Sequence, residues 1–407
     1  MDGQAVIRLR ILHVISGLDP QNGGPTTALV GMTQSQVAAG LDVTILATWK
    51  IPDGLPVADG LRSHGVKVIH IGPATGKLSR HPTLAAETDR VVAGADVVHI
   101  HGLFEEVQHQ AARAAQRRGV PYIITPHGML SPWNLAQGKW AKRFYLFWRL
   151  RKNLDRAAAI HYTCDVERDL VAPLKIKAKP LVERLGLDLF EFRELPPRGS
   201  FRAKWPQLGD KPFVLFLGRI DYKKGLDILI PAFAAANLGG TLLVIAGPDR
   251  DGYESTVRAM VARHSLQDRV LFTGMLHGGD RLAAYVDATL FALTSHQENF
   301  GITVIEAMAC GCPVLISDQV NIHGEVTKSG GGEVIPVDVT ATSRGLEKWM
   351  RDEAMRRAAG EKGRGFVMAR YGWEMNAREW KKHYGAIFQV GSAPRAGSLG
   401  TQNNPSG

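Results

Sequence analysis

Two glutamates that flank a glycine are the residues in this sequence with the clearest chemical use. Glu298 and Glu306 lie in the segment 296–307 (HQENFGITVIEA), with Gly301 between them. We expect Gly301 to open a helix whose free N–H groups can hold a phosphate. Glu298 would then reach an attached sugar, and Glu306, about two turns into the helix, would accept hydrogen bonds from ribose hydroxyls. The plainer alternative for either residue alone is a helix cap or a surface carboxylate.

Two cations follow an expected strand at residues 213–217. Arg219 comes directly after the strand and a glycine, and Lys224 follows five residues later, before another glycine. A diphosphate suits such a pair, because the guanidinium binds oxygens as a planar fork and the ammonium acts as a point charge. The two side chains would stabilise a departing nucleoside diphosphate without a metal. A solvated basic turn is the alternative, and the position at a strand end argues against it.

The first half of the chain offers weaker candidates. Gly23 and Gly24 precede a helix, where the backbone can approach an anion closely, although a plain flexible turn fits equally well. His127 stands beside a glycine at the end of an expected strand, a place suited to polar contact or acid–base work; a histidine bonded to nearby backbone is the alternative. We expect His99 and His101 to be structural. The fingerprints GxGxxG and GxxxxGK are absent.

These residues need a scaffold that gathers strand ends at one edge. Short apolar runs alternate with helical periods along most of the chain, a pattern typical of α/β folds with parallel sheets covered by helices on both faces. Ligands bind beyond the carboxyl ends of such strands. The strands are expected at residues 10–16, 43–48, 67–71, 96–101, 121–126, 158–163, 213–217, 241–246, 269–272, 289–293 and 313–316.

We predict two doubly wound, Rossmann-like domains with a cleft between them. The first covers residues 1–195 and would carry the acceptor side, and the second covers 213–372. The segment 196–212 contains four prolines and is expected to be a linker. Residues 373–390 are expected to form an amphipathic helix, and 391–407, rich in Gly, Ser, Asn and Pro, a disordered tail.

Taken together, the motifs resemble the retaining glycosyltransferases of family GT4, which have the two-domain GT-B fold. The resemblance extends to about residue 388, and its motifs stand in the family's order. They are Gly23–Gly24, His127–Gly128, Gly218–Arg219 with Lys224–Gly225, Gly247–Pro248, Gly274–Met275 and the pair Glu298 and Glu306. The resemblance further implies that the last helix crosses back to the first domain.

The resemblance implies a donor site built mainly by the second domain. Arg219 and Lys224 would hold the pyrophosphate of a nucleotide-sugar, Glu306 the ribose, and the backbone near Met275 the base. Further contacts to the diphosphate would come from small residues and backbone at Gly23, Gly24, Gly301, Ile302 and Thr303.

The resemblance also implies where transfer takes place. Glu298, Asn299 and Phe300 would contact the transferred sugar, and His127 would line the transfer site. The catalytic roles would thus fall on His127 and Glu298. No metal and no cofactor are expected. Retention is expected through front-face attack assisted by the departing phosphate, because no carboxylate stands out as a nucleophile.

The expected function is therefore transfer of a sugar to a glycan or a lipid-linked acceptor, in surface polysaccharide synthesis of the exopolysaccharide or lipopolysaccharide type. A nucleotide-sugar epimerase or a phosphorylase on the same fold is one alternative, although a ribose-binding Glu306 argues against a phosphorylase. A non-catalytic nucleotide-sugar binder or scaffold is another. The donor base, the sugar, the linkage and the oligomeric state are not readable from these residues.

The composition indicates the cellular compartment and the partners to expect. The chain has 407 residues, a net charge of +10 and three cysteines, Cys164, Cys310 and Cys312, which we expect to be reduced. Neither a signal peptide nor a long apolar span is visible, so a cytoplasmic protein is expected. The segment 139–156 mixes seven Lys or Arg with five aromatic residues. It is expected either to pack as a helix with a basic outer face or to lie on an anionic membrane at the inner surface of the cell; nucleic acid is not expected as a partner.

Overall fold

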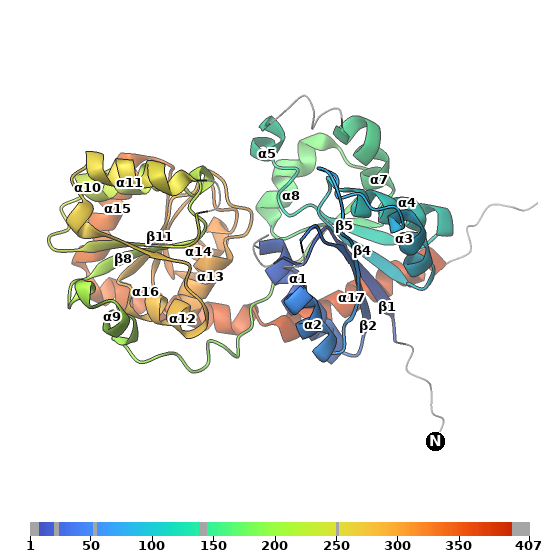
Figure 1. The fold of residues 1–407 in the computed structure, drawn as a ribbon. Helices are drawn as coiled ribbons and strands as arrows, with labels where there is room; N and C mark the ends of the chain where they lie inside the picture. Colours follow the sequence, from blue (N-terminus) through green and yellow to red (C-terminus); the bar gives the residue numbers. More distant parts are fainter. Residues whose placement is uncertain (1–7, 20–23, 52–54, 138–144, 250–251, 393–407) are drawn as a thin grey trace, which may run out of the picture.

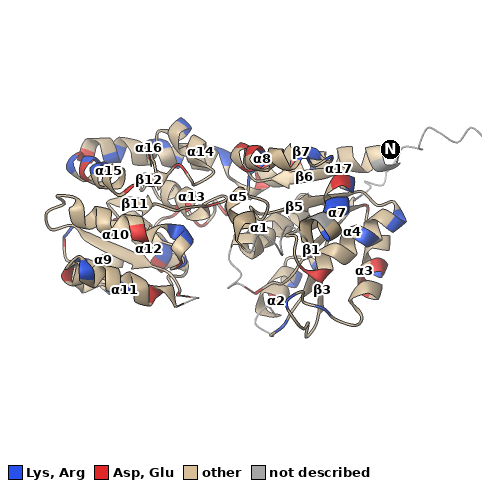
Figure 2. Cartoon of the chain, turned by 90° about the horizontal axis from the view of Figure 1, so that it is seen from above, with Lys and Arg blue, Asp and Glu red and all other residues tan. Residues whose placement is uncertain are grey.

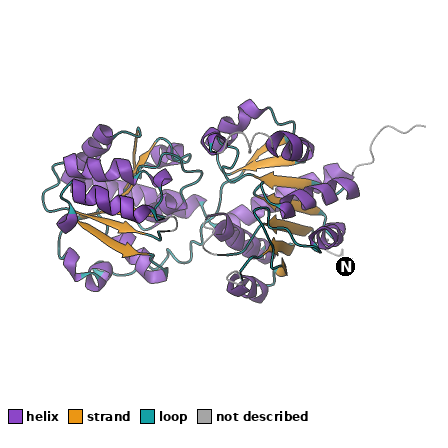
Figure 3. Ribbon diagram, turned by 45° about the horizontal axis from the view of Figure 1, so that its top comes forward, coloured by secondary structure: helices purple, strands orange, loops and turns teal. Residues whose placement is uncertain are grey.

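The computed structural model describes residues 8–19, 24–51, 55–137, 145–249 and 252–392. Over these residues the chain forms two lobes, each built around its own parallel sheet (Figure 1). The expected α/β class with two Rossmann-like domains is therefore confirmed. Helices flank both sheets (Figure 3), so most strands are buried on both faces and are made of nearly continuous apolar residues.

The first domain contains a parallel sheet with the strand order β3-β2-β1-β4-β5-β6-β7. Its strands are β1 (Arg10–Ile15), β2 (Asp42–Thr48), β3 (Lys67–Ile71), β4 (Val97–His101), β5 (Tyr122–Thr125), β6 (Ala159–Tyr162) and β7 (Lys179–Val182). The helices described around it are α1 (Gly24–Ala38), α2 (Leu55–Ser63), α3 (Leu84–Ala93), α4 (Glu106–Arg118), α5 (Pro132–Ala136), a π-helical turn (Leu146–Leu150), α7 (Arg151–Arg156) and α8 (Asp165–Val171).

The second domain repeats this plan with the strand order β10-β9-β8-β11-β12-β13. Its strands are β8 (Phe213–Leu217), β9 (Leu242–Ala246), β10 (Val270–Gly274), β11 (Leu290–Leu293), β12 (Val314–Ser317) and β13 (Gly332–Ile335). The helices described around it are α9 (Ser200–Lys204), α10 (Leu226–Ala235), α11 (Tyr253–Arg263), α12 (Gly278–Asp287), α13 (Ile302–Ala309), α14 (His323–Ser329), α15 (Val339–Arg351) and α16 (Glu353–Arg370).

The strands predicted from apolar runs are confirmed within one or two residues at each end. Two edge strands, β7 and β13, were not predicted. Each has four residues, and β7 contains a proline and β13 begins with a glycine. Both are mostly half-buried or exposed, because an edge strand is hydrogen-bonded on one side only. Short, mixed segments of this kind carry no periodic apolar signal.

The segment predicted as a linker, 196–212, contains folded structure. Helix α9 begins there, and the Asp287 carboxylate at the end of α12 accepts hydrogen bonds from the backbone N–H groups of Gly199 and Phe201 at 2.6 and 2.9 Å. The Phe201 side chain is fully buried in the second domain's core. The prolines are compatible with this because proline is tolerated in the first turn of a helix, as at Pro206. The segment is thus packed on the second domain.

The chain passes between the domains twice, and the two crossings touch. Leu187, after β7, donates its N–H to the Tyr371 carbonyl at 2.6 Å and accepts from the Trp373 N–H at 3.3 Å. Helix α17 (Trp373–Ser392) then leads from this point onto the first domain (Figure 1). Its Trp380 and Tyr384 side chains are fully buried in a core cluster with residues of β1 and β2. Of the expected tail at 391–407, residues 393 onward lie outside the described part.

Charge is spread over both lobes. Lys and Arg residues are interspersed with Asp and Glu on the helices of each domain (Figure 2). Among the helices that the structure describes, none is both long and apolar enough to cross a bilayer.

The strand order places a reversal point at the same location in each sheet. Consecutive strands run outward in one direction from β1 and in the other from β4, and likewise from β8 and β11. Open parallel sheets bind ligands beyond the carboxyl ends of the strands at this point, because the loops there diverge. The loops after β8 and β11 are the ones that carry the candidate residues Arg219, Lys224 and Glu298.

Candidate active site

A half-buried ion pair joins the two loops at the reversal point of the second sheet. Lys224, from the loop after β8, lies in hydrogen-bonding contact with Glu298, from the loop after β11. Both side chains are only 18% exposed. Burial alone raises the pKa of Glu298, but the charges of Lys224 and Lys223 and the bond from Lys224 outweigh it, so this pKa lies below its ordinary value. Glu298 is therefore held as a carboxylate.

Gly225 fixes the position of Lys224. Its φ is +72°, and a Cβ added there would lie 1.9 Å from the Thr294 carbonyl oxygen at the end of β11. The Thr294 hydroxyl in turn donates to the Gly225 carbonyl at 2.7 Å. Because this contact leaves no room for a side chain, the two loops approach closely enough for Lys224 to meet Glu298.

Arg219 lies on the same loop in a different environment. Its side chain is 41% exposed, and its guanidinium is 3.8 Å from the Asp221 carboxylate. Asp221 is bonded to the backbone N–H of Lys223 at 2.7 Å, which rigidifies the turn beneath the arginine. The cation can therefore reorient toward an anion at the strand ends without breaking a buried pair.

Glu306 is held by two residues that the sequence did not single out. It lies on α13 with 6% exposure, and its two oxygens contact the Arg281 guanidinium and the Tyr285 hydroxyl, the latter at 3.0 Å. Arg281 also binds Glu191, on the crossing segment, at 2.6 Å. Burial raises the pKa of Glu306, and Arg281 and Tyr285 offset this only in part. A carboxylate has about four acceptor positions, so it can still accept a ligand hydroxyl.

The helix predicted to open at Gly301 is confirmed. Gly301 is its N-cap, with φ +73°, and α13 begins at Ile302. Ile302 and Thr303 are half-buried, so the first turn of the helix reaches the surface, while Phe300 is packed into the core at 5% exposure. Free N–H groups in the first turn are the feature that binds anions.

Asn299 connects the two domains. Its side-chain amide nitrogen donates to the Thr163 hydroxyl at 3.1 Å, and its backbone carbonyl oxygen accepts a weak bond from the Cys164 thiol at 3.8 Å. Thr163 follows β6 of the first sheet. The Lys223 ammonium adds a second contact, 4.7 Å from the ring centre of Trp133. Strand-end loops of the two sheets therefore meet directly.

His127 lies on the first-domain side of this contact. It follows β5, has φ +50°, which is unusual for a residue with a side chain, and is half-buried. Its Nε2 atom is 3.2 Å from Nδ1 of His101. Burial lowers the pKa of His127 to about 4, so the ring is neutral near pH 7.

A buried carboxylate, missed in the sequence, shapes this turn. Glu167 on α8 is 1% exposed; one oxygen accepts from the Gly128 N–H at 2.6 Å and the other from the Thr163 N–H and hydroxyl at 2.8 and 2.9 Å. Burial raises its pKa. Glu167 thereby binds the turn of His127 to the end of β6. Helix α8 has seven residues and was not predicted, so no signal distinguished Glu167.

The remaining predicted residues are spread more widely. Met275 follows β10 and is 55% exposed, and Gly24 begins α1 in the first domain. Gly23 lies outside the described residues. The base contact at Met275 and the phosphate contact at the glycine pair therefore stay predictions.

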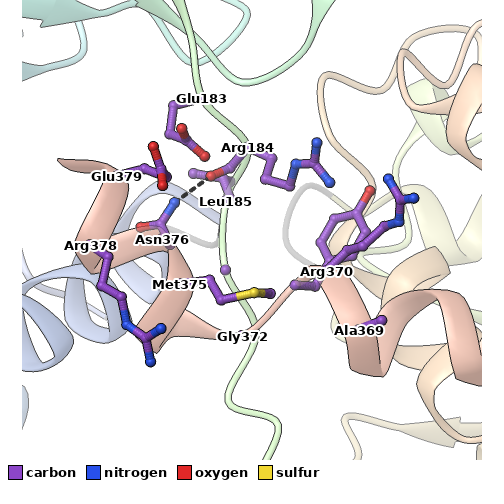
Figure 4. A pocket seen from close by; sticks show the side chains of 12 residues that line it. Glu183, Arg184, Leu185, Ala369, Arg370, Gly372, Met375, Asn376, Arg378 and Glu379 are labelled. Carbon is purple, nitrogen blue, oxygen red and sulfur yellow. Dashed lines mark hydrogen bonds between the residues drawn. The ribbon is translucent and has the colours of Figure 1, made fainter. Parts of the chain in front are cut away.

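A cavity of about 440 Å³ lies elsewhere, between the two crossing segments (Figure 4). The side chains that line it come from residues 183–186, the end of α16 and the start of α17. None of the predicted site residues is among them. The strand-end loops and this hinge cavity are thus separate places in the described structure.

Comparison with known proteins adds independent information. The model of the glycosyl transferases group 1 family matches residues 197–366, and that of the glycosyl transferase 4-like domain matches 23–183. A D-inositol 3-phosphate glycosyltransferase of Actinosynnema mirum is 30% identical over 72% of this chain and 75% of its own length. A GDP-mannose:cellobiosyl-diphosphopolyprenol alpha-mannosyltransferase of Xanthomonas campestris is 25% identical over 81% of this chain and 84% of its own length.

The fold has close structural counterparts as well. The crystal structure of Anabaena Alr3699/HepE in complex with UDP and glucose superposes with a TM-score of 0.76 at 18% identity, over 93% of this chain and 100% of that one. At this level of identity the match concerns the fold alone.

Proposed function

The chain belongs to the glycosyl transferases group 1 family and is a glycosyltransferase with the GT-B fold, and from this premise we propose that it moves a sugar, with retention, from a nucleotide diphosphate-sugar to a glycan or lipid-linked acceptor. The observation that carries the proposal is the pairing of Lys224 with Glu298 beside the start of α13. This arrangement offers a cation, a carboxylate and free helix N–H groups at one reversal point.

The donor diphosphate binds at the cations in this proposal. Lys224 exchanges its contact with Glu298 for a phosphate oxygen, Arg219 turns toward the second phosphate, and the first turn of α13 adds N–H groups. Glu298, released from Lys224, accepts hydrogen bonds from hydroxyls of the sugar. When the bond from the anomeric carbon to the phosphate oxygen breaks, the charge that develops on the leaving diphosphate is stabilised by these groups.

The nucleoside part extends toward Glu306. Arg281 and Tyr285 already orient the two carboxylate oxygens of Glu306, so this carboxylate is held in place to accept hydrogen bonds from the ribose hydroxyls. In the proposed retaining reaction the acceptor hydroxyl attacks the anomeric carbon from the side of the departing phosphate, and its proton passes to the phosphate oxygen. His127 lines the transfer site in this proposal, near the donor sugar.

The acceptor and the cellular setting are proposed from the relatives. The Xanthomonas campestris relative is named for a diphosphopolyprenol acceptor. An acceptor on a lipid carrier, in surface polysaccharide synthesis at the inner face of the cytoplasmic membrane, would suit a cytoplasmic enzyme with a basic segment at residues 139–156.

The described part of that segment limits how it would bind lipid. Arg149 pairs with Glu106 at 2.5 Å, and Arg151 binds Asp155 at 2.7 Å, so both cations are engaged within the first domain. Lys152 is exposed, and the Trp148 side chain is 71% exposed. Residues 138–144 lie outside the described part. Membrane contact through this segment stays a proposal that rests on Lys152 and Trp148.

A release assay tests the function. Purified protein is incubated with labelled UDP-, GDP- and ADP-sugars, with and without a lipid extract, and free nucleotide and product sugar are measured. Release that depends on the extract, with retained anomeric configuration by NMR, supports the proposal. Conversion of the sugar without release would instead indicate an epimerase, and tight binding with neither change would indicate a scaffold.

A further inference from the structure

A hydrogen-bonded chain of neutral side chains runs through the first domain and ends at His127. It contains five histidines and links four strands with α1 and α17. We call it the histidine relay; in order from one end it consists of the Glu183 carbonyl, His161, Thr125, His99, Tyr384, Gln36, His13, His101 and His127. The four inner histidines are at most 2% exposed.

At one end of the relay, the direction of the hydrogen bonds from donor to acceptor is fixed. The Glu183 carbonyl oxygen can only accept, and it lies 2.7 Å from Nε2 of His161, so that nitrogen carries the hydrogen. Neutral His161 then has a lone pair at Nδ1, which accepts from the Thr125 hydroxyl at 2.8 Å. Because that hydroxyl has a single hydrogen, it must accept from Nε2–H of His99, 2.7 Å away.

The same donor-to-acceptor direction continues through Tyr384 on α17. With its hydrogen at Nε2, neutral His99 accepts at Nδ1 from the Tyr384 hydroxyl at 2.8 Å. Tyr384 has no second hydrogen to donate, so it accepts from the Gln36 amide nitrogen at 3.2 Å. This orients the Gln36 side chain with its carbonyl oxygen toward His13, whose Nε2 lies at 2.8 Å and must donate.

The last steps determine the state of His127. His13 accepts at Nδ1 from Nε2–H of His101, at 2.9 Å. His101 then has its lone pair at Nδ1 and accepts from Nε2–H of His127, at 3.2 Å. Nδ1 of His127 is therefore left without a hydrogen, and within the described residues it has no hydrogen-bond partner.

These hydrogen-bond directions hold for neutral histidine rings, and burial keeps the rings neutral. It lowers the pKa of His13 and His127 to about 4 and that of His161 to about 3, and the pKa values of His99 and His101 also fall far below the ordinary value. Nitrogens of His13, His99 and His101 lie within 4.8 Å of one another, close enough to hold a metal ion. Both ring nitrogens of each are already used in the relay, which favours the hydrogen-bonded reading.

We propose that the relay fixes His127 as the Nε2–H tautomer, so that its Nδ1 presents a hydrogen-bond acceptor to the substrate. The ring would then favour a ligand hydroxyl and disfavour a phosphate oxygen, which has no hydrogen to donate. Tyr384 and Thr125 act through His127 and are positioning residues. The effect on transfer rests on the proposed function, whereas the tautomer of His127 does not.

The tautomer is measured directly on the full-length protein labelled with ¹⁵N-histidine. Long-range ¹H–¹⁵N correlation spectra at pH 7 distinguish protonated from unprotonated ring nitrogens, and the His127 signals are those missing from His127→Gln. We expect a protonated Nε2 and an unprotonated Nδ1. A protonated Nδ1, or an imidazolium, would overturn the proposal whatever the enzymatic activity.

Two variants interrupt the relay at different places. Tyr384→Phe removes the hydroxyl between His99 and Gln36, and Thr125→Val removes the one between His161 and His99. In each we expect His127 to populate both tautomers and kcat to fall several-fold, with Thr125→Ser restoring both readouts. Tyr122→Phe is the matched control, because the Tyr122 hydroxyl is also buried in the first domain but donates to the Asn153 carbonyl, at 2.6 Å, outside the relay.

The outcomes separate the two proposals. Unchanged His127 signals in both Tyr384→Phe and Thr125→Val, in protein whose other histidine signals show a native fold, would overturn the relay. The expected tautomer without transfer of sugar from any donor would leave the relay standing and count against the proposed function. Equal loss of kcat in Tyr122→Phe, with an unaltered tautomer, would show a general packing effect and also count against the relay.

Discussion

The two domains have the same sheet plan but opposite polar interiors. Within the strands of the first domain and in the turn after β5, buried histidines form a relay of neutral rings, with the buried Glu167 carboxylate beside its His127 end. In the second domain, half-buried cations instead meet carboxylates, in the pairs of Lys224 with Glu298 and Arg281 with Glu306. The shared fold therefore determines where the loops meet, whereas the side chains determine whether the polar groups there are neutral or charged.

The difference has a physical consequence. Neutral donors and acceptors orient one another without the large desolvation cost of an ion, so they can specify direction, as in the relay. Buried ion pairs carry that cost, and their charges become available to an anionic ligand that replaces one partner. In the proposed reaction, the first domain would therefore orient ligand hydroxyls and the second would hold the diphosphate.

The largest expected effect is a loss of stability of the first domain in acid. Histidines with a folded pKa near 4 and an unfolded pKa near 6.5 bind more protons when unfolded, so the stability they contribute is present above about pH 6.5 and is lost as the pH falls toward 4. At pH 5 the protonation of His13 alone, with a folded pKa of about 4, should lower the free energy of unfolding by about 2 kcal/mol. His99, His101 and His161, whose pKa values are lowered by burial as well, should act in the same direction. Hydrogen exchange at pH 7 and pH 5 should show β1, β4 and β6 losing protection before β8, β9 and β11. Earlier loss in the second domain would contradict the comparison.

Removal of the charge at Lys224 should have the next largest effect. In the proposed reaction, Lys224→Ala takes away a cation that would stabilise the leaving diphosphate, and such donors are worth about 100-fold or more in kcat. Nucleotide release and thermal unfolding are measured together, since the fold should survive. Lys328→Ala, an exposed lysine on α14, serves as the control. A normal rate in Lys224→Ala would mean that the diphosphate binds elsewhere.

A smaller loss is expected at Glu306. Glu306→Gln keeps the size of the side chain but removes the charge that would strengthen the proposed bonds to the ribose, which corresponds to about 10- to 100-fold in kcat/KM. Tyr285→Phe should lose less, because the hydroxyl only orients the carboxylate. The same assay with nucleotides as competing ligands checks the assignment. If nucleotides inhibit Glu306→Gln and the unaltered protein equally strongly, the ribose does not bind at this position.

The smallest effect is expected at the basic segment of the first domain. A lysine near an anionic bilayer is worth about 1 kcal/mol, so Lys152→Gln should reduce binding to vesicles that contain phosphatidylserine by about fivefold. Sedimentation with these vesicles and with neutral ones measures it. Lys211→Gln, an exposed lysine of the second domain, should bind as the unaltered protein does. Equal binding by both variants would dismiss lipid contact at Lys152.

Much of the fold was predictable from apolar periodicity. The inner strands of both sheets are runs of four to seven mostly apolar residues, and such runs have few alternatives once they recur between helices. The edge strands β7 and β13, short helices such as α8, and the folded segment within 196–212 were not predictable in this way. Their stability comes from neighbours distant in the sequence, for example the Asp287 carboxylate that caps α9.

The sequence by itself determined the types and spacing of Lys224, Glu298 and Glu306, and the glycines that let their loops approach, because these are local properties of strand ends and helix starts. Only the tertiary structure decided their partners. Arg281 is 25 residues from Glu306, and Tyr384 is 285 residues from His99. Hydrogen bonds and ion pairs depend on distance in space to within a fraction of an ångström, and that distance is set by the packing of whole domains, which no local pattern encodes.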